Sequence, residues 1–199
     1  MGWLSLALLS AFSLASVDAA TKAWLQGFSA RELTLVRLGG GALALSPLLA
    51  GLPPLSTLPT AFWAWLAALV PLELLAMLLY MRAIRDHPLS LTLPYLAFTP
   101  VFVIVVAWLL LGEQVSLQGA TGIGLVVVGA WLLNGERARR GDWRSWADPW
   151  RAILREPGSR LMLAVAAIYA LTSTLGKGAM GYMAPEQFGA FYFAVLGLS

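Results

Sequence analysis

The chain has 199 residues, of which 59% are hydrophobic and 12% are charged, and its mean hydropathy is +0.77. Soluble domains are about 45 to 50% apolar and about 25% charged, so this composition excludes an ordinary soluble protein and predicts an integral membrane protein. The sequence contains no cysteine, which excludes disulfides, thiolate metal sites and cysteine nucleophiles. Its formal charge is +3.

Long apolar segments follow one another along the chain. The hydrocarbon core of a bilayer is about 30 Å thick, and about 20 helical residues cross it. Six segments reach that length, and a seventh helix begins near Gln187 and is cut short at Ser199, which predicts a truncated chain. The predicted fold is therefore an all-α polytopic helical bundle. The six spans are Trp3–Ala23, Leu33–Gly51, Pro59–Met81, Leu89–Leu111, Leu117–Asn134 and Leu161–Met183.

Basic residues gather in the first, third and fifth loops. Seven arginines lie between Arg137 and Arg160. Cytoplasmic loops carry an excess of Lys and Arg, so these loops are expected in the cytoplasm and the N-terminus outside. In the 136–160 linker, Trp143, Trp146 and Trp150 fall on one helical face, which predicts a helix on the membrane surface beside anionic lipid. Nucleic acid is not an expected partner.

The sixth span and the residues after it read like a second copy of the first. Lys22 is followed by Ser29–Glu32, which opens a helix, and Lys177 is followed by Ala184–Gln187. Five spans, an odd number, precede the second copy, so it enters the membrane with opposite polarity. This pattern indicates an inverted repeat, which is common in transporters. The predicted division is residues 1–135, a linker at 136–160, and the start of a second unit at 161–199.

Several segments resemble one transporter family. The fourth span contains Leu93–Phe102 (LPYLAFTPVF), and Trp108–Glu113 (WLLLGE) and Gly119–Leu125 (GATGIGL) follow it. With Lys22–Arg37, these segments resemble the EamA-like family of the drug/metabolite transporter superfamily. The resemblance implies ten helices in two inverted five-helix repeats, the second incomplete here. It also implies transport of small metabolites or drugs.

One acid, Glu73, lies near the middle of the third span. A charged residue at the bilayer centre costs about 2.5 to 3.5 kcal/mol, against a gain of about 0.3 to 0.6 kcal/mol for each apolar neighbour. Packing does not require such a residue, so Glu73 is the leading candidate for proton exchange or for binding a cationic substrate. The alternative is a polar contact with a neighbouring helix. Pro71, close by, is a predicted kink.

The fourth span carries polar residues at helical spacing. Thr92, Tyr95 and Thr99 are three and four residues apart and are expected to share one face. Pro94 and Pro100 each remove a backbone hydrogen bond and are predicted to kink the helix. Freed carbonyls at membrane depth must face protein or a wet cavity. This face is therefore a predicted wall of the substrate site, unless the threonines only bond their own helix.

Charged residues also mark the first and sixth helices. Asp18 and Lys22 are four residues apart and are predicted to pair, with Lys22 reaching toward the lipid headgroups. The sixth helix carries Tyr169 and Lys177 as the corresponding candidates. Its polar face also includes Thr172, Ser173 and Gly176.

Two remaining features are expected to be structural. Ser116, Ala120 and Gly124 place small residues at four-residue spacing on the fifth helix, which predicts helix packing or a homodimer contact. His87, the single histidine of the sequence, is expected to be a loop residue.

The function predicted is a secondary transporter, an exporter that works by alternating access, with Glu73 coupling protons or binding positive charge. A non-transporting membrane subunit or scaffold, and a channel, remain as alternatives. An intramembrane enzyme is not expected, because the sequence lacks HExxH, cysteine and a metal cluster. The expected partners are a small-molecule substrate and membrane lipid, with no cofactor and no metal. The expected location is a bacterial inner membrane.

Overall fold

A computed structural model of the chain describes residues 2–114, 116–132 and 155–199. This part contains helices and no strand, as expected from the sequence. Five helical segments are long and apolar enough to cross a membrane, and α5 is a shorter apolar helix. The α-helices are α1 (Trp3–Trp24), α2 (Ala30–Leu45), α3 (Thr60–Asp86), α4 (Thr99–Leu111), α5 (Leu117–Leu132), α7 (Pro157–Met180) and α8 (Pro185–Leu198). The predicted interfacial helix falls almost wholly outside the described residues.

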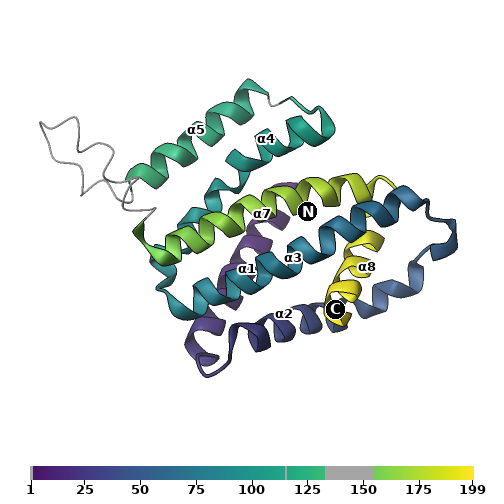
Figure 1. Cartoon of the computed structure of the whole chain (residues 1–199), viewed down its shortest axis with the longest axis horizontal. Helices are drawn as coiled ribbons and strands as arrows, with labels where there is room; N and C mark the ends of the chain where they lie inside the picture. The colour runs from purple at the N-terminus through teal and green to yellow at the C-terminus, as the bar shows by residue number, and fades with distance from the viewer. Residues whose placement is uncertain (1, 115, 133–154) are drawn as a thin grey trace, which may run out of the picture.

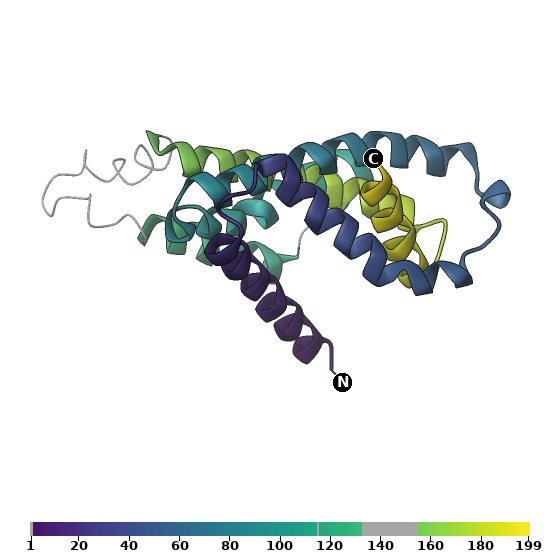
Figure 2. The same cartoon turned by 90° about the horizontal axis from the view of Figure 1, so that it is seen from below.

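The core forms where α3 and α7 lie side by side through the centre of the molecule (Figure 1). Helix α4 packs on α7, and α8 packs on α2 (Figures 1 and 2). Fully buried apolar side chains from α3, such as Met81 and Ile84, meet Met162 and Val165 of α7. The last helix pair of the chain is therefore built into the bundle formed by the preceding helices.

Sequence signals at helix starts account for several boundaries. Ser29 caps α2: its hydroxyl accepts a hydrogen bond from the Glu32 amide at 3.3 Å, and the Glu32 carboxylate accepts one from the Ser29 amide at 2.7 Å. This reciprocal arrangement satisfies two otherwise unpaired donors at the start of the helix. Helix α7 begins four residues before the predicted span, at Pro157, because proline is well suited to a first helical turn.

The fourth span is not the continuous α-helix that was predicted. Two 3₁₀ segments, η3 (Leu89–Leu91) and η4 (Leu93–Phe98), precede α4. Pro94 and Pro100 each stand in the first turn of a new segment, η4 and α4. Proline lacks an amide hydrogen and restricts the residue before it, so it starts helical segments more readily than it continues them. Helix α3, in contrast, continues through Pro71.

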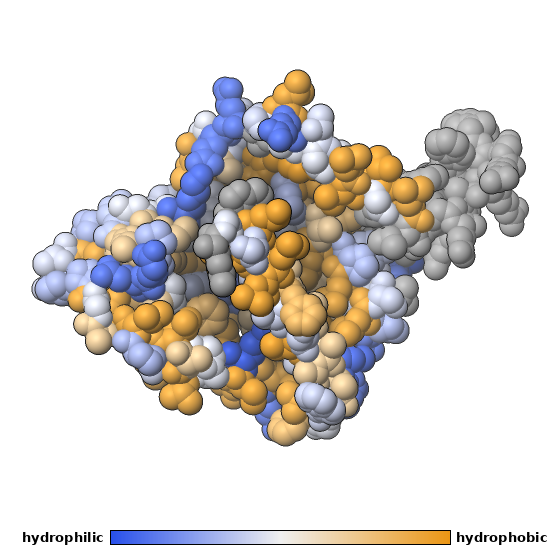
Figure 3. Space-filling model, turned by 180° about the vertical axis from the view of Figure 1, so that it is seen from behind, coloured by the Kyte–Doolittle hydropathy of each residue, from blue (hydrophilic) through white to orange (hydrophobic). Residues whose placement is uncertain are grey.

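Helix α1 makes few contacts with the rest of the molecule and slants away from it toward its N-terminus (Figure 2). Its apolar side chains are exposed, with Phe12 at 71%. Much of the face shown in Figure 3 is likewise apolar. Such a surface suits lipid or another membrane helix.

Candidate functional site

A pocket of about 420 Å³ that mixes apolar and polar side chains lies between α3, α4, α7 and α8. Glu73 from α3 and Thr99 from the start of α4 line it, together with Tyr169, Thr172 and Ser173 of α7. Three of the predicted candidates, Glu73, Thr99 and Tyr169, therefore meet in one place. We call this cavity the Glu73 pocket.

The α7 wall of the pocket follows from helical spacing. Tyr169, Thr172, Ser173 and Gly176 are separated by three, one and three residues, so they fall on one helix face. Thr172 and Gly176 are buried, whereas Ser173 is exposed and marks an open side of the pocket.

Glu73 is half-buried, and hydroxyl groups from two other helices interact with it. These hydroxyls belong to Thr172 of α7 and Tyr192 of α8. The Tyr192 hydroxyl is buried and makes no hydrogen bond of standard geometry among the described residues. A buried hydroxyl normally has a partner, and the carboxylate of Glu73 is the group that Tyr192 interacts with.

A second polar group joins α1, α2 and α3. Arg37 of α2 donates a hydrogen bond to Asp18 of α1 at 2.6 Å, and the Tyr80 hydroxyl donates to the other oxygen of the same carboxylate. Asp18 is 2% exposed. The guanidinium also lies over the Tyr80 ring, 5.5 Å from its centroid, a cation–π distance. Asp18 is thus a buried carboxylate with two donors.

An aromatic contact connects the two polar groups. The rings of Tyr80 and Tyr169 lie 6.3 Å apart between centroids. Tyr169 lines the Glu73 pocket, while Tyr80 bonds Asp18. The two polar groups are therefore joined by packed aromatic side chains.

The predicted pair of Asp18 and Lys22 is wrong. The Lys22 ammonium instead donates to three carbonyl oxygens at the end of α3, those of Ile84 at 2.9 Å, Arg85 at 2.8 Å and His87 at 3.1 Å. The carbonyls at a helix C-terminus lack intrahelical partners and attract a cation. Lys22 therefore binds this helix end and does not reach toward the headgroups.

Thr92, Tyr95 and Thr99 do not form the expected wall of one helix, because Thr92 precedes η4, Tyr95 lies within it and Thr99 begins α4. Thr92 is fully buried and donates to the Pro88 carbonyl at 3.1 Å. Tyr95 is buried in the core and stacks with Phe98. Among the three, only Thr99 lines the Glu73 pocket.

Four other candidates lie away from both polar groups. Lys177 pairs with Glu113 at 2.5 Å on the surface. Ser116 caps α5 by accepting a hydrogen bond from the Gly119 amide at 3.1 Å. Ala120 and Gly124 are exposed on the same helix, so this face packs against nothing in the described chain and the homodimer contact stays a prediction.

His87 follows the last residue of α3 and lies in the connection to η3, so it is a loop residue as expected, and its side chain is half-buried. Its Nδ1 lies 3.6 Å from a carboxylate oxygen of Glu156, at the start of α7.

Sequence reasoning missed Arg37, Tyr80 and Tyr192. Arg37 lies inside the predicted second span, so the rule that singled out Glu73, an ionisable residue at membrane depth, also applies to it. The tyrosines gave no such signal, since tyrosine is common in apolar helices.

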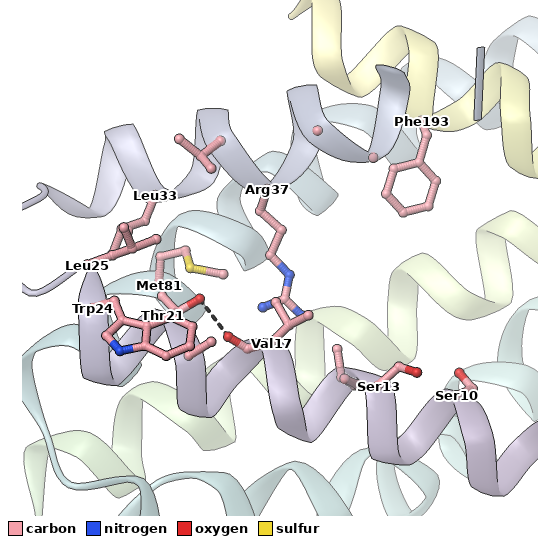
Figure 4. Close-up of a pocket in the computed structure, with 15 residues that line it drawn as sticks. Ser10, Ser13, Val17, Thr21, Trp24, Leu25, Leu33, Arg37, Met81 and Phe193 are labelled. Carbon is pink, nitrogen blue, oxygen red and sulfur yellow. Dashed lines mark hydrogen bonds between the residues drawn. The ribbon is translucent and has the colours of Figure 1, made fainter. Parts of the chain in front are cut away.

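A larger cavity of about 630 Å³ lies between α1 and α2 (Figure 4). Its walls are mostly apolar, and Arg37 reaches into it from α2 toward α1. We call this cavity the α1–α2 groove.

Comparison with known proteins agrees with this architecture. The sequence model of the EamA-like transporter family matches residues 1–135. The chain belongs to the EamA-like transporter family. The resemblance read from the sequence is thereby confirmed, and the protein is a multi-pass protein of a membrane transporter family.

Curated relatives of this EamA-like protein carry the name probable 4-amino-4-deoxy-L-arabinose-phosphoundecaprenol flippase subunit ArnE. The protein from Enterobacter sp. (strain 638) is 33% identical over 37% of this chain and 68% of its own length. Those from Aeromonas hydrophila and Yersinia pseudotuberculosis are 38% and 36% identical over 36% and 35% of this chain. The match spans 62% and 61% of their lengths. No solved structure matches the chain.

Proposed function

We propose that this EamA-like protein is a secondary transporter that binds its solute in the Glu73 pocket and moves it by alternating access. One observation carries the proposal: an acid inside a membrane-spanning helix lines a pocket together with the hydroxyl-bearing side chains of Thr172 and Tyr192. Intramembrane acids usually mark substrate or proton pathways. The solute leaves the pocket chemically unchanged.

The chemistry of the pocket indicates the kind of solute. A carboxylate in a pocket that Thr99, Thr172, Ser173 and Tyr192 also line accepts hydrogen bonds from a protonated amine or from hydroxyl groups. Apolar side chains, Leu69 and Phe188, complete the walls. An amino sugar or an organic cation with a small polar head fits these donors, acceptors and charges.

Glu73 also supplies a means of coupling. The carboxyl binds a proton when the pocket opens to the acidic side and releases it when the pocket opens to the other side. Protons entering a bacterial cell in this way drive solute outward, which is the direction proposed here. In this proposal the protein lies in a bacterial inner membrane with its N-terminus outside the cell.

A second candidate function is a subunit of a larger transporter. The relatives are named as flippase subunits, and α1 exposes apolar side chains over most of its length. In this role the chain pairs with another membrane subunit and contributes the Glu73 pocket to a shared path.

Counterflow in proteoliposomes tests the transport function. The native protein, with any subunits that copurify, is reconstituted with a panel of unlabelled amino sugars and quaternary ammonium compounds inside, and trace labelled compound is added outside. A transporter accumulates the label transiently above equilibrium, whereas a channel cannot. Lack of accumulation across the panel, for the chain and for its copurified complex, would contradict the proposal.

A further inference from the structure

The end of α3 and the start of α7 meet at one end of the bundle (Figure 1). His87 directly follows α3, and Glu156 directly precedes α7. The His87 Nδ1 lies 3.6 Å from the Glu156 Oε1, which is an ion-pair distance once the imidazole carries a proton. The helical spans that they adjoin are Thr60–Asp86 and Pro157–Met180. Both side chains therefore lie just outside the spanning segments, where water can deliver a proton.

The backbone of His87 is held at both of its polar groups. Its amide donates a hydrogen bond to the Ala83 carbonyl at 3.1 Å, and its carbonyl accepts one from the Lys22 ammonium of α1 at 3.1 Å. The imidazole therefore projects from a fixed point, so a change in its charge acts on the groups that surround it.

The first turn of α7 touches His87 at a glycine. A Cβ atom on Gly158 would lie 2.7 Å from the His87 Cγ and 2.9 Å from the Thr92 Cγ2. Thr92 is itself fully buried. Contacts this close leave no space for a larger residue at this position, so the two helix ends are in direct contact beside the imidazole.

The Glu156 carboxylate connects this contact to α7. Its Oε1 accepts a hydrogen bond from the Gly158 amide at 3.4 Å, and the same oxygen faces His87. The His87 and Glu156 side chains are 21% and 30% exposed. The carboxylate therefore attaches the first turn of α7 to a histidine that remains accessible to solvent.

Charged groups of both signs surround the imidazole. A cavity of about 430 Å³ lies beside it, and the other charged side chains that line this cavity are Arg82, Asp86 and Arg160. Asp86 is bound by Arg85 at 2.6 Å. The two arginines of the cavity and the Lys22 ammonium oppose a charge on His87, whereas Asp86 and Glu156 favour it. Among the described side chains, His87 is the basic group that pairs with Glu156.

The bundle is closed between this contact and the Glu73 pocket. His87 follows Glu73 by fourteen positions in the sequence, or about 21 Å at 1.5 Å per helical residue. Over this distance α3 and α7 share one buried cluster, which includes Tyr80, Met81, Ile84, Met162 and Val165. Solute can reach the Glu73 pocket from this end only if the two helices separate here.

We propose that His87 and Glu156 form a proton-operated latch between α3 and α7. When His87 takes up a proton, its ion pair with Glu156 holds the two helix ends together and keeps this end of the bundle closed. When the proton leaves, the attraction is lost and the ends separate more readily. Histidine suits this task because its charge changes between about pH 5 and 8.

The latch is separate from the Glu73 pocket. It rests on the proposed function only where the closed end is taken as one stage of alternating access. The pairing of the helix ends can be measured without any solute, so a failure of the latch and a failure of transport are distinguishable.

Pulsed EPR distances in the full chain, reconstituted in nanodiscs, test the proposal. The sequence has no cysteine, so Ser90→Cys and Ala164→Cys, at exposed positions on the two sides of the contact, can carry spin labels without competing sites. We expect one short distance at about pH 5.5 and a second, longer distance at about pH 8. The share of the longer distance should rise about threefold, as expected for one partly exposed ion pair.

Four variants, all with the same label pair, assign the response. His87→Gln and Glu156→Gln should each remove the pH response and keep the longer distance at its high-pH share. Asp86→Asn changes the neighbouring acid, which Arg85 binds, and should preserve the response. Glu186→Gln changes an exposed carboxylate at the start of α8 and should also preserve it.

A double-mutant cycle on the unlabelled protein separates the ion pair from a general loss of folding. The coupling between His87→Gln and Glu156→Gln, measured by thermal unfolding, should be present at about pH 5.5 and absent at about pH 8. Three results would overturn the latch: a pH response that persists in His87→Gln, a response lost in Asp86→Asn but kept in Glu156→Gln, or equal coupling at both pH values.

Discussion

Arg37 of α2 and Asp18 of α1 form a 2.6 Å ion pair within the membrane-spanning part of the bundle. Together with the Tyr80 hydroxyl and the Lys22 ammonium, this pair attaches a helix whose apolar contacts with the rest of the molecule are few. Polar bonds in a low-dielectric environment are directional and specific. The position of α1 therefore depends on a few side chains rather than on a broad packed surface.

Tyr80→Phe should destabilise the protein by about 1 to 2 kcal/mol, because it leaves one oxygen of the buried Asp18 carboxylate without a donor. Thermal unfolding in detergent micelles measures the effect. Tyr182→Phe is the matched control, since the Tyr182 side chain is exposed. Equal melting temperatures for the two variants would contradict a structural role for the Tyr80 hydroxyl.

Lys22→Met should destabilise the protein by about 1.5 to 3 kcal/mol, because three carbonyl oxygens at the end of α3 lose a charged donor. Lys177→Met removes the same side chain from an exposed pair with Glu113, which is worth about 0 to 1 kcal/mol. Hydrogen exchange should show faster amide exchange near Ile84 and His87 in Lys22→Met alone. Similar exchange in both variants would show that Lys22 does not hold this helix end.

Gly197→Ala should weaken the contact between α2 and α8. An added Cβ would lie 2.6 Å from the Ala42 Cβ and 3.2 Å from the Leu38 carbonyl oxygen, so a helix must shift, which costs about 1 to 3 kcal/mol. Gly189→Ala on the same helix meets nothing within 4 Å and should be neutral or stabilising, since alanine favours helix. Thermal unfolding compares them, and equal loss in both would argue against close packing at Gly197.

The membrane-spanning helices were predictable because hydropathy and length determine which segments cross a bilayer. Glu73 could be named as a candidate site residue from the sequence, because a charged side chain is costly at membrane depth. Its meeting with Thr99 and Tyr169 then followed from packing three apolar helices with their polar sides together. The prediction of one continuous fourth helix was wrong, because Pro94 and Pro100 stand at the starts of new helical segments.

The partners of Asp18 were not predictable from local spacing. Lys22 is four residues away on the same helix, yet Arg37 and Tyr80 bind the carboxylate from other helices. Local spacing shows which side chains can meet on one helix, whereas tertiary packing decides which of them do. The carbonyl partners of Lys22 could not be predicted either, because the sequence does not show that α3 ends beside it.

Glu73→Gln should leave exchange of an uncharged, hydroxyl-bearing solute intact and remove its dependence on pH, because glutamine still accepts hydrogen bonds but cannot bind or release a proton. Uptake into proteoliposomes with and without a pH gradient measures this, using such a compound that the wild-type protein exchanges. Glu186→Gln, an exposed carboxylate at the start of α8, serves as the control. A pH-dependent Glu73→Gln protein would exclude proton coupling at Glu73, and loss of exchange itself would assign Glu73 to solute binding.

The most direct test of the central claim is to obstruct the Glu73 pocket and measure counterflow. Ser173→Phe places a bulky ring at the open side of the pocket, and Ser16→Phe places the same ring on an exposed face of α1 outside both cavities. We predict that wild-type and Ser16→Phe proteins accumulate labelled solute alike, whereas Ser173→Phe loses about tenfold or more, or about 1.4 kcal/mol. Wild-type counterflow in a folded Ser173→Phe protein would show that solute does not pass through this pocket.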